Sequence, residues 1–252
     1  MANPVLNRTF NRENLQYGPA GVEIPTVDGV QTASGTGARM TMDGVVSRTL
    51  ALFGVLAVTA VFTWMTQAVW LILPALVVAI GLGLWATFSK KVRPAVMFGY
   101  AAAEGVVLSA LTYVFDIVYP GIGFQAVLAT TVTAGVVFAA YRSGAIRVTP
   151  KFRQIMMFAL IGYMGFALIN LVFGMFTGSS GIYSSQFGWI AALIGVGLSA
   201  FTLVMDFADI EEGIGIGLPA QEEWRAAFGL MVSLVWMYTE ILRLLAILRG
   251  ND

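Results

Sequence analysis

The sequence contains no cysteine and no histidine. Without cysteine the chain cannot build a disulfide framework or a thiolate metal site, and without histidine it cannot build a serine–histidine pair or an HExxH zinc site. Any response to pH near neutrality would have to come from carboxyl groups, because histidine is the usual titrating side chain in that range. We therefore expect no enzyme activity and no resident cofactor.

Charged residues are scarce as well. They make up 11% of the 252 residues, whereas 58% are hydrophobic. The formal net charge is zero and the chain has no long basic run, so the electrostatic surface that nucleic acid requires is missing and no nucleic-acid partner is expected. A chain this apolar is typical of a protein whose solvent is the lipid bilayer. The composition predicts an all-α membrane protein.

Seven apolar stretches follow a polar N-terminal segment, and each is long enough to cross roughly 30 Å of hydrocarbon as a helix. The first is expected to begin before Arg48, whose long side chain can reach the interface. Residues 1–42 predict a flexible cytoplasmic tail, and residues 43–249 predict a seven-helix transmembrane domain. The predicted spans are Thr49–Met65, Ala68–Phe88, Pro94–Phe115, Ile122–Ala140, Ile155–Phe176, Phe187–Met205 and Ala226–Leu248.

The basic residues predict the orientation, because lysine and arginine gather in cytoplasmic connections. The first, third and fifth connections hold none, and the C-terminal tail holds only Arg249. We therefore expect a multi-pass protein of the cell membrane with its N-terminus in the cytoplasm and its C-terminus outside. The N-terminal segment and the second, fourth and sixth connections hold twelve of the fourteen: Arg8, Arg12, Arg39, Arg48, Lys90, Lys91, Arg93, Arg142, Arg147, Lys151, Arg153 and Arg225.

Five ionisable residues lie within or beside the spans and are candidates for a pH-sensing or ion-pathway site. A charge in hydrocarbon has to face a partner, the bundle interior or a water-filled cavity, so such residues point to function. Alternatively, Asp206 and the acids after it are a helix end and a solvated acidic loop. The five candidates are Glu104 in the third span, Glu240 and Arg243 in the seventh, Asp206 at the end of the sixth, and Asp209 beside it. Two further acids, Glu211 and Glu212, follow Asp209 at the predicted cytoplasmic mouth.

Glu104 and Glu240 are expected at similar depths. Glu104 lies roughly 15 Å into the third span and Glu240 roughly 21 Å into the seventh, at the rise of an α-helix. Both spans enter from the predicted cytoplasmic side, so the two carboxyls could meet and share a proton. Alternatively, Arg243 neutralises Glu240 as a structural ion pair one helical turn away. The sequence leaves both alternatives open.

Four segments resemble the Bax inhibitor 1 (transmembrane Bax inhibitor motif) family, and its bacterial branch most. They are YRSGAIRVTPKF (Tyr141–Phe152), FTLVMDFADI (Phe201–Ile210), WRAAF (Trp224–Phe228) and EILR (Glu240–Arg243), within a likeness that covers Asp43 to Arg249. The resemblance implies a bundle with the seventh helix at its centre. It also implies a pH-sensitive calcium leak, controlled by two aspartates that share a proton between the sixth and seventh helices.

Asp206 matches the first of these two aspartates. The second falls on Met237, so the pair that the resemblance implies is broken, and Glu240 is a candidate to replace it one turn further along. The first functional hypothesis is therefore a passive, proton-modulated pathway for a cation, with calcium bound only transiently. The second is a non-conducting regulatory partner of another membrane protein, such as a quality-control protease. A secondary transporter is a third hypothesis, although the chain shows no clear internal repeat.

Overall fold

The structure, a computed structural model, describes residues 38–177, 183 and 188–250. Residues 1–37 of the predicted tail, and Phe187 at the start of the predicted sixth span, lie outside the described residues. Within the described ranges the regular structure is helical and no strand forms. This confirms the predicted all-α fold.

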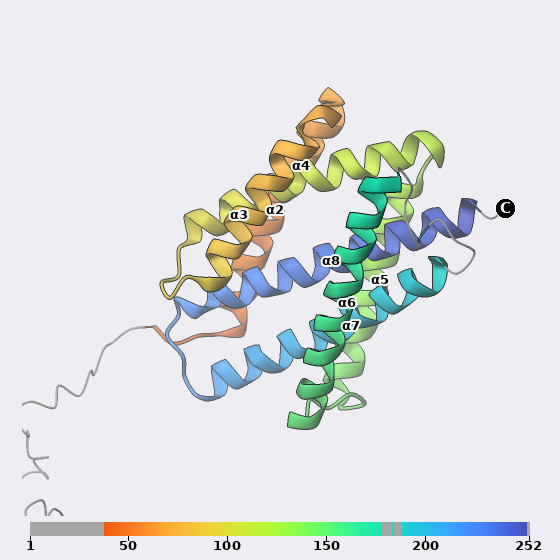
Figure 1. Cartoon of the computed structure of the whole chain (residues 1–252). Helices are drawn as coiled ribbons and strands as arrows, with labels where there is room; N and C mark the ends of the chain where they lie inside the picture. The colour runs from red at the N-terminus through yellow and green to blue at the C-terminus, as the bar shows by residue number, and fades with distance from the viewer. Residues whose placement is uncertain (1–37, 178–182, 184–187, 251–252) are drawn as a thin grey trace, which may run out of the picture. The chain divides into compact units, whose positions relative to one another are not determined.

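Seven long helices match the seven predicted spans (Figure 1). Each is long and apolar enough to cross a bilayer, which confirms a multi-pass membrane protein. A short 3-10 turn, η2 (Val69–Leu71), leads into the second of them. In chain order the seven helices are α2 (Met42–Thr66), α3 (Ile72–Phe88), α4 (Pro94–Val118), α5 (Ile122–Arg142), α6 (Pro150–Thr177), α7 (Gly188–Gly215) and α8 (Glu222–Gly250).

Helix α2 begins seven residues before the first apolar stretch. The hydroxyl of Thr41 accepts a hydrogen bond of 3.0 Å from the backbone N–H of Gly44 and so caps the helix. Asp43 in the first turn adds a favourable charge at the positive end of the helix dipole. Arg48 therefore lies inside the helix, as predicted.

Helix α7 is longer than predicted, and this overturns one interpretation of the acidic residues. It continues past Met205 to Gly215, because Ile210 is buried and keeps the extra turns packed against the bundle. The helix stops where Gly217 adopts a left-handed conformation with φ of 71° and donates its N–H to the carbonyl of Ile214. The acids after Asp206 therefore lie on a helix and not in a loop.

Helix α8 is the centre of the bundle (Figure 1). It packs chiefly against α7, α2, α5 and α4, whereas α3 packs chiefly on α4 and α6 on α7. Half of its apolar span is buried inside the protein, a larger share than in any of the other six long helices. The predicted central position of the seventh span is confirmed.

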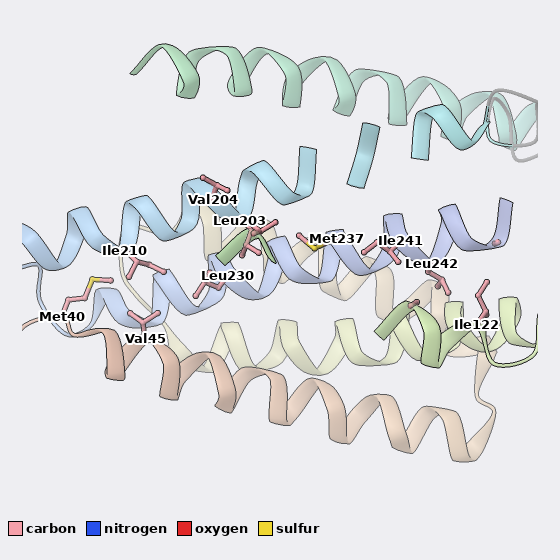
Figure 2. Packing of buried hydrophobic residues seen from close by; sticks show 13 residues of the cluster. Met40, Val45, Ile122, Leu203, Val204, Ile210, Leu230, Met237, Ile241 and Leu242 are labelled. Carbon is pink, nitrogen blue, oxygen red and sulfur yellow. The ribbon is translucent and has the colours of Figure 1, made fainter. Parts of the chain in front are cut away.

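Two clusters of buried apolar side chains line α8. One runs along the contact with α7 and includes Leu203, Leu230 and Met237 (Figure 2). The other joins the N-terminal half of α8 to α2, α3 and α4, and includes Leu52 and Met231. Large apolar side chains on the outer helix faces stay exposed in the bare protein, as is expected of surfaces that contact lipid.

The last residues of the predicted tail pair with the connection between α7 and α8. Met40 donates its backbone N–H to the carbonyl of Leu218 over 2.7 Å, and Ala220 donates to Ala38 over 2.8 Å. The side chain of Met40 is buried in the cluster along α7 and α8. The chain from Ala38 onward is therefore part of the bundle.

Candidate functional site

Asp206 lies on α7 and faces α8. Ser233 donates its hydroxyl to Asp206 Oδ2 over 2.5 Å, and Gly229, one turn earlier on α8, lies next to the same carboxyl group. Asp206 is half-buried and forms no ion pair with any residue that the structure describes. We call this contact between Asp206 and Ser233 the Asp206 seam.

The residue opposite Asp206 differs from the one expected. The resemblance placed the partner position at Met237, but Met237 is fully buried among apolar side chains one turn further along α8. Ser233 faces Asp206 instead, so a neutral hydroxyl lies where the resemblance implies a second aspartate. Glu240 does not take that position, because it lies seven residues beyond Ser233, or about 10 Å along the helix.

Glu240 is held by its own network in the other half of α8. Its carboxylate accepts a hydrogen bond of 2.8 Å from Arg243 and one of 3.0 Å from the indole N–H of Trp236. Glu240 is only 3% exposed. The guanidinium carbon of Arg243 lies over the ring of Tyr183, 4.4 Å from its centroid. The alternative of a structural ion pair therefore describes Glu240 in this structure.

The Glu240 network also reaches α6 and α7. Tyr163 on α6 bonds through its hydroxyl to the hydroxyl of Tyr183 over 3.1 Å, and its ring packs against Trp236. Gly195 on α7 makes the approach possible, because a Cβ atom there would come within 2.5 Å of both Glu240 Oε2 and the Tyr163 hydroxyl. The network fastens the two outer helices to the central one.

Glu104 does not meet Glu240. Tyr100 on α4 packs against Phe228 on α8 with ring centroids 5.1 Å apart, which fixes the relative level of the two helices. Glu104 lies four residues beyond that level and Glu240 twelve residues beyond it, so the two are separated by about 12 Å along the bundle. The side chain of Glu104 interacts instead with the hydroxyl of Tyr100, one turn away.

The depth expected for Glu240 was too shallow because α8 begins at Glu222, four residues before the apolar stretch that starts at Ala226. The first turn of α8 is helical, but its charged residues hide it from a search for apolar stretches. Counting from Ala226 therefore placed Glu240 one turn too close to the predicted cytoplasmic end.

The acids at the predicted mouth are paired. Arg153, at the start of α6, forms ion pairs with Asp209 and with Glu212, the latter at 3.2 Å. Tyr141, at the end of α5, donates its hydroxyl to Glu211 over 2.6 Å. Because these groups are exposed, each pair contributes little to stability and can exchange with solvent ions. The mouth is a set of exchangeable surface pairs rather than a ring of free carboxylates.

A buried charge cluster at the start of α8 was missed in the sequence. Glu223 is 3% exposed, forms an ion pair with Arg48 on α2, and accepts hydrogen bonds from the backbone and the hydroxyl of Thr41. The guanidinium of Arg48 also lies over the ring of Trp224 at 5.4 Å. In the sequence, Glu223 looks like one of the solvated acids that commonly begin a helix. The signal that could have revealed its ion pair was Arg48, an arginine at the edge of the first span.

In the part of the chain that the structure describes, carboxylates do not gather into a cluster that would hold a metal ion. Within the described ranges, no group of three or more aspartate or glutamate side chains lies close enough together for this. Asp206, Glu104 and Glu240 each have a different set of neighbours. The candidate site is therefore the Asp206 seam with the paired acids of α7 next to it.

Comparison with known proteins agrees with this architecture. The family model described as Bax inhibitor 1 like matches residues 3–250. The chain belongs to the Bax inhibitor 1 like family. A comparison with curated proteins found no match. Family membership and the seven apolar helices together make the chain a helical protein embedded in the lipid bilayer, whereas its place in the bacterial branch stays a prediction.

The Glu240 network makes a testable prediction for this member of the Bax inhibitor 1 like family. Arg243→Gln leaves the buried carboxylate of Glu240 without its cation, so we expect a loss of roughly 1–3 kcal/mol of stability. The measurement is the thermal unfolding midpoint of the purified protein in detergent.

Lys91→Gln is the matched control, because it removes one positive charge from an exposed position. The double variant Glu240→Gln with Arg243→Gln should recover part of the loss, since no unpaired charge remains in the bundle. A midpoint for Arg243→Gln equal to that of Lys91→Gln would show that the ion pair has no structural role.

Proposed function

We propose that the protein is a passive pathway for a cation, with calcium as the main candidate, and that the protonation of Asp206 controls the opening of this pathway. The observation that supports this most is the Asp206 seam, where a carboxyl group inside the bundle has a neutral hydroxyl as its hydrogen-bond partner. A carboxyl group without a cationic partner is rare among transmembrane helices and typical of ion and proton pathways.

The two charge states of Asp206 would have opposite effects on the seam. As a neutral acid it satisfies its hydrogen bonds with Ser233, and α7 and α8 stay packed together. As an anion in a low-dielectric setting it requires water or a cation, and drawing either one in loosens the contact between the helices. Glu240 would not respond in this way, because Arg243 already supplies its counter-charge.

The acids of α7 offer a route to the seam. Asp209 lies one helical turn from Asp206 toward the predicted mouth, and its exposed ion pair with Arg153 can exchange for an arriving cation. The described residues offer no cluster of three carboxylates, so a cation would be bound weakly at each step. Weak successive sites suit passage, because tight binding would stop the flow.

We propose further that the acidic end of α7 faces the cytoplasm, which follows from the bias of lysine and arginine toward the N-terminal segment and the even-numbered connections. A cysteine-free chain allows a clean test with single cysteines. A membrane-impermeant thiol reagent should label Thr66→Cys in intact cells, and Ser143→Cys only after permeabilisation. The reverse pattern would contradict the orientation.

Calcium flux into liposomes tests the function itself. The protein should admit calcium several-fold faster at neutral than at acidic pH, because the ionised form of Asp206 is the one that admits a cation. Asp206→Asn, which cannot ionise, should give a low flux that no longer changes with pH. A fluorescent calcium indicator inside the liposomes measures the rate.

Asp116→Asn is the matched control, because Asp116 is also a half-buried aspartate, but it lies near the end of α4, away from the seam, and accepts the N–H of Gly121. This variant should keep the full pH dependence. Calcium influx that is indifferent to pH, and equal in Asp206→Asn and Asp116→Asn, would refute the proposal. Absence of any flux in all three proteins would favour the alternative of a non-conducting partner of another membrane protein.

A further inference from the structure

A hollow of about 340 Å³ lies where α5 and α7 end on the predicted cytoplasmic side. Its wall comes from the last turn of α5, the connection that follows, and the acidic end of α7. Tyr141, Arg142 and Arg147 line one part, and Ala208 and Glu211 line the other. The hollow is separate from the Asp206 seam, which lies between α7 and α8.

The charges in the hollow are of both signs. Arg142 and Arg147 are exposed, and neither side chain forms a hydrogen bond or an ion pair with the described part of the chain. Arg153, a few residues further along, is by contrast engaged with two acids of α7. Glu211 is fixed in place by the hydroxyl of Tyr141 through one oxygen, Oε2. A ligand of the hollow would meet two free cations and one anchored anion.

An apolar stripe on α5 leads into the hollow from the bilayer. One face of the helix carries residues at successive spacings of seven, three and four positions, namely Leu128, Gly135, Phe138 and Arg142. Leu128 is 55% exposed and Phe138 49% exposed, while a Cβ atom at Gly135 would meet open space. The stripe is therefore apolar, and no other part of the described chain covers it between Leu128 and Arg142.

A phospholipid has the same order of groups, with acyl chains first and a charged headgroup at the interface. Arginine binds phosphate oxygens through its forked donors, and basic pockets at the cytoplasmic ends of transmembrane helices suit lipid headgroups. Glu211 disfavours a headgroup with extra negative charge and can accept hydrogen bonds from a primary ammonium group. A choline group lacks such donors.

We propose that this hollow binds the headgroup of a phosphoethanolamine lipid. The phosphate lies between Arg142 and Arg147, the ammonium group faces Glu211, and an acyl chain follows Phe138 along α5. The proposal shares Glu211 with the acids of the predicted mouth but uses neither Asp206 nor Ser233, so it can hold whether or not the protein conducts ions.

Native mass spectrometry of the detergent-solubilised protein tests it, with phosphatidylethanolamine, phosphatidylglycerol or phosphatidylcholine added one at a time. The wild type should retain phosphatidylethanolamine several-fold better than either of the other lipids. The double variant Arg142→Gln with Arg147→Gln should lose most of this retention. The matched control is Lys90→Gln with Lys91→Gln, which removes the same charge from another basic connection and should bind as the wild type does.

Two further arms identify the chemistry. Glu211→Gln should shift the preference from phosphatidylethanolamine toward phosphatidylglycerol, because the anion that favours the ammonium group is gone. Inorganic phosphate and glycerophosphoethanolamine at millimolar concentration should fail to displace the lipid, since they lack the acyl chain. Equal retention by the two double variants would overturn the proposal, and full displacement by inorganic phosphate would assign the hollow to a soluble phosphate instead.

Discussion

Hydrocarbon offers no hydrogen-bonding groups, so every polar side chain on α8 has to find its partner inside the protein. Glu223 binds an arginine of α2, Ser233 binds an aspartate of α7, and Tyr238 binds a threonine of α4. Glu240 is satisfied by α8 itself and lies against a tyrosine of α6 and a glycine of α7. Because these partners lie on different helices, α8 can satisfy all of them only at the centre of the bundle.

The same constraint gives the carboxyl groups different properties. Glu223 and Glu240 are almost fully buried and each has an arginine within bonding distance, which lies on α2 for Glu223 and on α8 itself for Glu240, so the charge of both is compensated. Asp206 has the hydroxyl of Ser233 and no cation among the described residues. Glu104 has only the hydroxyl of Tyr100 and is uncompensated as well, but of these two carboxyl groups Asp206 is the one that lies on α7, one turn from its exposed acids. A carboxyl group whose charge is not compensated is one whose protonation can alter packing. The proposed pathway depends on this difference.

The spans could be predicted because apolar length against a fixed bilayer thickness is a local property of the sequence. The extra turns of α7 could not, because the burial of Ile210 against other helices stabilises them. The partner of Asp206 depends on the register between α7 and α8, and a shift of one turn exchanges Met237 for Ser233. Such a shift leaves no trace in the periodicity of either helix.

Water access to the Asp206 seam is the most direct test of the account. Met237→Cys places a single thiol in the closed contact between α7 and α8, one turn beyond Ser233, in a chain without other cysteines. Its labelling by a water-soluble thiol reagent can be divided by that of the exposed Ser143→Cys, which removes the reagent's own pH dependence. The ratio should rise from acidic to neutral pH and stay low when Asp206→Asn is added. A ratio that is constant with pH, or unchanged by Asp206→Asn, would contradict control of the seam by Asp206.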